Sequence, residues 1–150
     1  VVAVSSVVDG RGLAAALALG AAGVLMGSRF LVTRESMAPD AHKKRMLEAT
    51  GDDTIVTAGL SGRDARVVRN AIADAWRDVD EVLPFPAQFI VNAGVFGAAQ
   101  ANDDVEHLPL WGGQGVGRID DLPWAADVVT ATVEQAVALL RDRSGVRLED

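Results

Sequence analysis

Two pairs of small residues stand where they could hold a phosphate group. Ser5-Ser6 follows the apolar run 1–4, and Gly27-Ser28 follows a second apolar run that begins at Gly23. Backbone N–H groups of small residues can approach phosphate oxygens closely, and serine hydroxyls add further donors. Turn formation at the ends of two strands accounts for the same residues equally well. The sequence leaves these two interpretations open.

The other polar residues do not assemble into a catalytic set. The chain has no cysteine and two histidines, which excludes thiol nucleophiles and argues against a multi-histidine metal site. His42 stands in a charged stretch and is expected to face solvent, whereas His107 lies in a polar segment beside Glu106. Arg29 is expected to form a structural salt bridge. The acidic pairs that are too isolated to predict a metal site are Asp52-Asp53 and Asp103-Asp104.

Composition limits the class of protein. The chain has 150 residues, of which 49% are hydrophobic, so we expect one folded unit with a core. Its formal net charge is −7 and it has no basic block, which excludes nucleic acid as an expected partner. No apolar run is long enough to span a membrane, and no secretion signal opens the sequence. We therefore expect no membrane partner and a cytoplasmic location.

The first 30 residues predict a β-α-β unit. Residues 1–4 are apolar and β-branched, which is typical of a strand buried on both faces. An Ala/Leu-rich stretch predicts a helix at 13–19, with Asp9 as its N-cap and Gly20 at its end. A second strand is expected at 23–27. Strands joined in this way are parallel, which brings both pairs of small residues to the same edge of the sheet.

The rest of the chain predicts mostly helices. We expect a helix at 39–49, a short strand at 54–57 and a helix at 87–100. A further helix is predicted from Arg66 onward by the apolar stripe Val68, Ile72, Trp76 and Val79. A closing helix is expected to bury the face formed by Val129, Val133, Ala136, Val137 and Leu140. Trp111, in the glycine-rich segment 111–117, could cover a pocket or anchor the segment in the core.

The start of the chain predicts a piece of a larger fold. Val1 lies within the expected first strand, and no methionine precedes it. Two parallel strands cannot cover their own faces and edges. The missing partner strands are therefore expected N-terminal to Val1.

Several motifs resemble one enzyme family. Asp9-Gly10-Arg11-Gly12 and, further on, Gly27-Ser28-Arg29-Phe30 are similar to a block found in the FMN-dependent nitronate monooxygenases, also called 2-nitropropane dioxygenases. The resemblance extends through Pro84-Phe85-Pro86-Ala87-Gln88 and through Leu108-Pro109-Leu110-Trp111-Gly112-Gly113-Gln114. It covers nearly the whole chain in the order of the family.

This resemblance implies an α/β fold, namely the C-terminal portion of a TIM (β/α)₈ barrel with its last two strands. Residues 1–30 would form the phosphate-site unit, 31–110 a mostly helical insertion, and 111–150 a Gly-rich loop and a closing helix. The implied cofactor is FMN, and the implied reaction is the oxidation of alkyl nitronates by O₂. The residues to which the resemblance assigns cofactor binding are Ser5, Ser6, Gly27, Ser28 and Gln114.

The chain departs from the family pattern in two respects. Val4-Ser5-Ser6-Val7 stands where the family has Ala-Gly-Gly-Ile, and serine would strain the turn if these positions require positive φ. The family's catalytic histidine lies in the N-terminal half, so no catalytic residue is assigned here and the 150 residues are expected to be inactive alone.

Two alternatives remain beside the nitronate monooxygenase. One is an FMN-dependent enoyl-[acyl carrier protein] reductase of the same superfamily. The other is a non-catalytic half-barrel that assembles with another chain. A second copy of the chain and a complementing N-terminal half are both open as protein partners.

Overall fold

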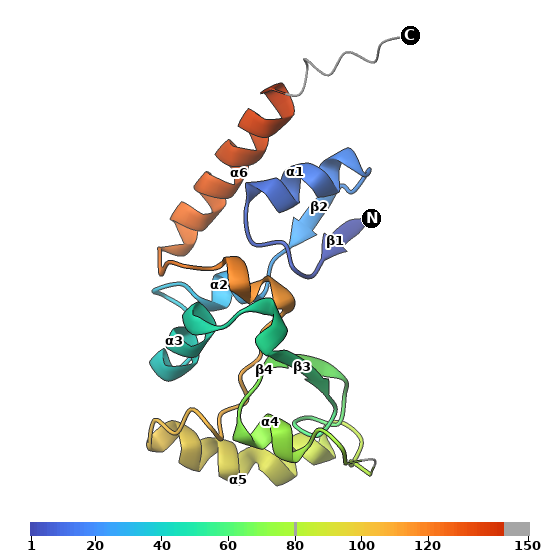
Figure 1. The fold of residues 1–150 in the computed structure, drawn as a ribbon, viewed down its shortest axis with the longest axis vertical. Helices are drawn as coiled ribbons and strands as arrows, with labels where there is room; N and C mark the ends of the chain where they lie inside the picture. The colour runs from blue at the N-terminus through green and yellow to red at the C-terminus, as the bar shows by residue number, and fades with distance from the viewer. Residues whose placement is uncertain (80, 143–150) are drawn as a thin grey trace.

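The computed structural model describes residues 1–79 and 81–142. Its elements form two groups (Figure 1): β1, β2, α1 and α6 lie at one end, and β3, β4, α4 and α5 lie at the other. The short helix α2, the helix α3 and the 3₁₀ helix η2 lie between the two groups. The chain is therefore an α/β structure with two small sheets rather than one.

The β-α-β unit is present as expected. Strand β1 (Val2–Val4) pairs in parallel with β2 (Gly23–Leu25), and helix α1 (Gly10–Ala18) connects them. Asp9 caps α1 by accepting a hydrogen bond from the Gly12 N–H at 3.0 Å, so the helix begins three residues earlier than predicted. Gly20, with φ +88°, lies just beyond its end.

The predicted burial of the first strand is wrong for the described chain. Val2 and Val4 are 55% and 62% exposed, whereas Ala3 between them is half-buried. Side chains alternate between the two faces of a strand. The face that carries Val2 and Val4 therefore has no cover among residues 1–79 and 81–142.

The middle of the chain contains a sheet of which the sequence predicted only one strand. Strand β3 (Thr54–Thr57) was expected, but residues 65–68 form β4 (Ala65–Val68), antiparallel to β3, instead of a helix. The β-branched side chains of Val67 and Val68 suit a strand, and pairing with β3 satisfies the backbone. A helix starts only after Asn70, whose side chain accepts from the Ala73 N–H at 3.1 Å.

The other elements of the middle segment are helical. They are α2 (Ser28–Leu31), α3 (Asp40–Glu48), η1 (Gly51–Asp53), α4 (Ala71–Ala75) and α5 (Ala87–Ala101). The predicted helices at 39–49 and 87–100 are confirmed by α3 and α5.

The core consists of two clusters. The larger is centred on fully buried residues from several segments, among them Val32, Met46, Leu110 and Val116. The smaller cluster packs β4 against α4 and α5, and its buried members are Leu60, Val67, Ile72, Ala73 and Phe96. The first cluster includes Val8, in the loop that follows β1, and the second includes Val67 of β4 with Ile55 of β3 packed against it.

The closing helix α6 (Ala125–Asp142) packs on α1. The two backbones come so close that a Cβ at Gly10 would lie 2.5 Å from the Thr132 carbonyl oxygen. The face against α1 carries Val128, Thr132 and Ala136, so the predicted burial of Val129, Val133, Val137 and Leu140 is wrong. Those four side chains are between 39% and 51% exposed. No helix in the described ranges has the length and hydropathy needed to cross a membrane.

Candidate phosphate-binding site

A cavity of about 250 Å³ lies at the carboxyl ends of β1 and β2. Ser5, Ser6, Gly27 and Ser28 all line it, as their spacing predicted. Gly113 and Gly115 line it as well, whereas Gln114 between them is exposed at the start of η2 (Gln114–Arg118) and is not a lining residue. The structure thus brings together four of the five predicted cofactor-binding residues, and their binding role stays a prediction.

The loop after β1 has the strained backbone that the sequence led us to consider. Ser5 has φ +82° and Ser6 has φ +55°, both in the left-handed region that favours glycine. An L-residue with a Cβ costs about 1 kcal/mol or more in this conformation. Serine at these two positions therefore keeps the loop geometry at an energetic cost that glycine would avoid.

The segment that contains η2 contacts the residues that follow both β1 and β2. The Gly113 N–H donates to Ser28 Oγ at 2.9 Å, and the Arg118 guanidinium donates to the Ser6 carbonyl oxygen. Gly115 lies so close to the first loop that a Cβ would be 3.1 Å from Ser6 Cα and 2.8 Å from Val8 Cγ1. Gly113 and Gly115 thus form one wall of the cavity, a role that their spacing alone did not reveal.

Uncharged groups line this cavity. Its described lining residues are Val4, Ser5, Ser6, Val7, Val8, Leu25, Gly27, Ser28, Gly113 and Gly115. Ser28 Oγ already accepts a hydrogen bond from Gly113, which leaves its hydroxyl hydrogen to be donated to a ligand. The hydroxyl-bearing residues Ser5 and Ser6 are exposed. An anion placed here would be bound by hydroxyl and backbone donors without a cationic side chain in the lining.

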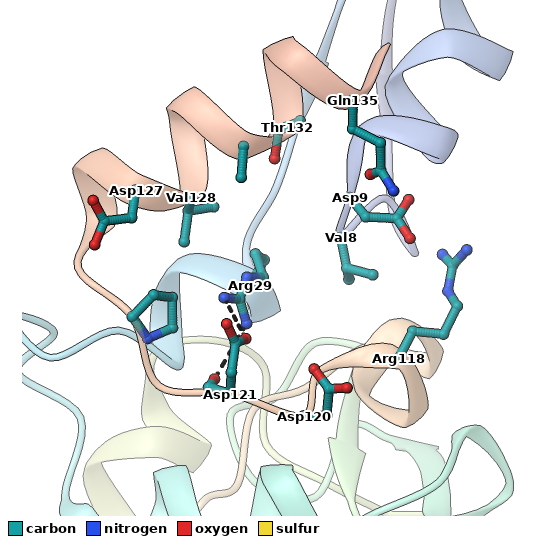
Figure 2. Close-up of a pocket in the computed structure, with 12 residues that line it drawn as sticks. Val8, Asp9, Arg29, Arg118, Asp120, Asp121, Asp127, Val128, Thr132 and Gln135 are labelled. Atoms are coloured by element: carbon teal, nitrogen blue, oxygen red, sulfur yellow. Dashed lines mark hydrogen bonds and ion pairs between the residues drawn. The ribbon is translucent and has the colours of Figure 1, made fainter. Parts of the chain in front are cut away.

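A second, more polar pocket of about 390 Å³ shares Val8 with the strand-end cavity and lies between the start of α1, α2 and α6 (Figure 2). Arg29 is 7% exposed and forms an ion pair with Asp121 at 2.7 Å, so its predicted structural salt bridge is confirmed. Arg29 also donates to the Asp121 carbonyl oxygen at 3.3 Å. The guanidinium is therefore committed to the 120–123 loop and not to the strand-end cavity.

Asp9 and Arg118 lie on the same side of this polar pocket (Figure 2). Partial burial pushes the pKa of Asp9 upward, but hydrogen bonds from the Gly12 N–H and from Arg11 outweigh it. The positive charges of Arg11 and Arg118 lower it further, so the pKa of Asp9 lies below its ordinary value. Asp9 is therefore held as a charged cap at the start of α1.

The two histidines differ from each other in environment. His42 was expected to face solvent, but it is 4% exposed, and its Nε2 lies 3.2 Å from the Trp111 carbonyl oxygen. Although α3 is a charged helix, its inner face carries His42 and Met46 one turn apart, which explains the error. Burial lowers the pKa of His42, outweighing the hydrogen bond to Trp111. His107 is exposed and pairs with Asp104 at 2.7 Å.

Trp111 anchors its segment in the fold. Its backbone forms a β-bridge with Val67, and its half-buried side chain packs against the smaller core cluster. The core-anchor interpretation of the sequence is therefore confirmed, and Trp111 also lines a pocket together with Phe89 and Phe96. The carboxylates have local roles: Asp53 completes a capping box with Thr50, and no cluster suited to a metal ion occurs among the described residues.

The fold and the strand-end cavity define an α/β protein with a small, hydroxyl-lined site where two parallel strands end. A family model described as "Nitronate monooxygenase" matches residues 1–135. The chain therefore belongs to the nitronate monooxygenase family.

Curated relatives agree with this family but are much longer. A "Probable nitronate monooxygenase" from Bacillus subtilis is 37% identical over 121 residues, which are 77% of this chain and 34% of the relative. A Mycobacterium tuberculosis protein named "(3aS,4S,5R,7aS)-5-hydroxy-7a-methyl-1-oxo-octahydro-1H-indene-4-carboxyl-CoA dehydrogenase" is 46% identical over 96 residues, which are 64% of this chain and 27% of the relative. The chain spans about a third of the length of these relatives.

Solved structures are similar over nearly the whole chain. The nitroalkane oxidase of Streptomyces ansochromogenes matches with a TM-score of 0.85 and 26% identity, covering 94% of this chain and 40% of that one. The M276A mutant of Thermotoga maritima FabK matches with a TM-score of 0.76 and 27% identity, covering 97% of this chain and 44% of that one.

Proposed function

We propose that this chain is the part of a flavin-dependent nitronate monooxygenase that holds the phosphate of FMN. The observation that carries this proposal is the cavity of about 250 Å³ that brings Ser5, Ser6, Gly27 and Ser28 together. The membership of the chain in the nitronate monooxygenase family supports it. In the whole protein, β1 and β2 would be the last two strands of a TIM barrel, which binds phosphate groups at such strand ends.

The residues of the cavity fit a phosphate monoester. Ser28 has a hydroxyl hydrogen available, because Gly113 already donates to its oxygen. Gly27 and Gly113 carry no side chain that would occlude the site, and a Cβ at Gly27 would meet nothing within 4 Å. Gln114, exposed between Gly113 and Gly115, would add an amide donor near the rim of the site.

Bound FMN would supply the redox centre at which an alkyl nitronate is oxidised by O₂. This chain's own contribution is to bind and orient the phosphate. Of its two histidines, His42 bonds to Trp111 and His107 to Asp104, and neither lines the strand-end cavity. No proton acceptor for the nitronate reaction is therefore assigned to this chain, and we expect it to bind FMN weakly and to be inactive alone.

Titration of the purified chain with FMN and with riboflavin, followed by flavin fluorescence, tests the phosphate site. We expect weak binding of FMN and at least tenfold weaker binding of riboflavin, which lacks the phosphate and about 1.4 kcal/mol or more of charge-assisted hydrogen bonding. Equal affinities for FMN and riboflavin would contradict a phosphate-binding role for this cavity. A tightly held flavin together with nitronate-dependent O₂ uptake would instead overturn the expected inactivity.

The enoyl-[acyl carrier protein] reductase remains the alternative, and the similarity to FabK fits it weakly. The reductase needs a nicotinamide donor and the monooxygenase does not. Oxidation of NAD(P)H by an enoyl thioester, measured on the chain combined with the remainder of a full-length relative, would favour the reductase. Nitronate-dependent O₂ uptake without NAD(P)H would favour the monooxygenase.

The hypothesis of a non-catalytic half-barrel can be tested by measuring whether the chain associates with a partner. The exposed Val2 and Val4 on β1 support an assembly partner, because an uncovered apolar strand face favours association. Size-exclusion chromatography with and without a co-expressed N-terminal half would show a shared peak for an assembling pair. A stable monomer in both samples would count against any partner.

A further inference from the structure

A third cavity, of about 300 Å³ and open to the surface, lies between α2, α3 and α5 and the segment that leads to Trp111. Its walls are mainly carbon, from Leu31, Phe89, Phe96, Leu108 and Trp111. None of the lining residues that the structure describes carries a charged side chain. We call this space the aromatic cavity.

Two aromatic side chains of the wall come from one helix. Phe89 and Phe96 lie two turns apart on α5, with ring centroids separated by 5.8 Å and ring planes inclined by 53°. Phe96 is buried, whereas Phe89 is 42% exposed, so this wall extends from the core to the surface. Such a tilted pair offers ring faces and edges to a planar apolar guest.

His42 is the buried polar side chain of the cavity, and its hydrogen bond fixes which nitrogen carries the proton. A carbonyl oxygen can only accept, so Nε2 must donate its hydrogen to Trp111 across 3.2 Å. Burial favours the neutral ring by lowering its pKa. In that ring Nδ1 is an acceptor without a hydrogen-bond partner among the described residues, and it is accessible rather than buried, because no buried side-chain nitrogen there lacks a partner.

These properties limit the chemistry of a ligand. An ion would lose its hydration without meeting an opposite charge in the lining, which makes charged ligands unfavourable. Burial of an apolar ring or short alkyl chain against apolar walls is energetically favourable. A volume of about 300 Å³ lies at the lower end of the range for small-molecule sites, which limits the guest to about one ring.

We propose that the aromatic cavity binds an uncharged small molecule with a planar apolar body and one O–H or N–H donor that bonds to His42 Nδ1. A phenol is the simplest such molecule. This site is distinct from the proposed nitronate chemistry, because a nitronate is an anion and offers no such donor. It is also separate from the strand-end cavity, with which it shares no lining residue in the described chain.

Three probes of similar shape test the ligand class on the unmodified chain. Phenol, toluene and benzoate would be titrated separately at pH 7.5 while the backbone amide and histidine ring resonances are followed by NMR. We expect saturable shifts with phenol, about fivefold weaker binding of toluene, which lacks the donor, and no binding of benzoate. The Nδ1 resonance of His42 should move with phenol and not with toluene.

Matched histidine variants test the role of the ring. His42→Phe keeps a ring of similar shape and removes the acceptor, so its affinity for phenol should fall to that for toluene. His107→Phe makes the same change at an exposed site and should bind phenol as the original chain does. Should His42→Phe not fold, the probe series on the unmodified chain still decides the question.

The proposal is overturned if phenol and toluene bind equally, if benzoate binds best, or if no probe gives saturable shifts. Phenol binding that survives intact in a folded His42→Phe chain would overturn it too. None of these measurements involves a flavin, so the proposal stands or fails independently of the FMN titration.

Discussion

The strand-end cavity and the aromatic cavity are built in opposite ways. The first is made largely by backbone: two serines with positive φ, and glycines whose missing side chains let segments far apart in sequence meet. The second is made by side chains from three helices and from the segment that leads to Trp111, with one histidine bonded to a carbonyl oxygen. Backbone cavities depend on local conformation, whereas side-chain cavities depend on packing. The two should therefore respond to different kinds of substitution.

Removal of a buried ring should have the largest effect on the aromatic cavity. Phe96→Ala is expected to lower the free energy of unfolding by about 3 kcal/mol, because Phe96 is only 8% exposed and belongs to the smaller core cluster. Urea unfolding followed by circular dichroism measures this change. Phe89→Ala, at a position 42% exposed, is the control and should cost less than half as much. Equal losses would contradict the assignment of Phe96, but not Phe89, to the buried core.

Addition of one methyl group should disturb the strand-end cavity. Gly115→Ala is expected to lower the free energy of unfolding by about 2 kcal/mol, since its Cβ would lie 2.8 Å from Val8 Cγ1 and 3.1 Å from Ser6 Cα. Gly27→Ala is the matched control in the same cavity. Its Cβ would meet nothing within 4 Å, and φ is −92°, so it should be nearly neutral. A neutral Gly115→Ala would contradict the close approach of the two loops.

Relief of backbone strain should stabilise the same loop. Ser6→Gly is expected to raise the free energy of unfolding by about 1 kcal/mol, because glycine adopts φ +55° without the Cβ penalty. Ser6→Ala retains the Cβ and should give no gain. Thermal and urea unfolding of both variants would check this difference. A loss of stability in Ser6→Gly beyond that of Ser6→Ala would mean that the left-handed conformation is not strained.

A pH comparison gives the smallest expected effect. Because burial lowers the pKa of His42 below its ordinary value of 6.5, the unfolded chain takes up a proton there more readily than the folded chain. The resulting stability is present above pH 6.5 and is lost as the pH falls toward the folded pKa, by at most about 1.4 kcal/mol per pH unit. Unfolding at pH 7.5 and 5.5 should show a smaller pH-dependent loss in His42→Gln. His107→Gln should retain the loss of the original chain.

Secondary structure could be predicted from the sequence more accurately in the β-α-β unit than in the segment that begins at Arg66. The β-α-β unit was predictable because Asp9, Gly20 and the apolar runs act locally, through a cap, a helix end and short strands. The helix expected from Arg66 failed because a 3.6-residue stripe of Val68, Ile72 and Trp76 also suits a strand followed by a short helix. Pairing with β3, a contact between separate segments, decided between the two. The same limit applies to the closing helix, whose existence was predictable and whose buried face was not.

The candidate phosphate site was predictable in part. Ser5, Ser6, Gly27 and Ser28 could be placed together because parallel strands end at the same edge of a sheet. Gly115 and Arg118 could not, since their contacts to Ser6 cross more than 100 residues of chain. His42 was misjudged because its sequence neighbours are charged, whereas its surroundings in space are apolar.

The sequence by itself determined that two small-residue pairs end two parallel strands, that no thiol chemistry is available, and that the motifs are those of the nitronate monooxygenase family. These properties depend on residue type and short-range spacing. Only the tertiary structure decided that Ser5 and Ser6 adopt positive φ, that the 113–118 segment closes their cavity, and that His42 lies in an apolar space. Each of those outcomes depends on which distant segments pack together, because burial and backbone conformation are set by the sum of long-range contacts.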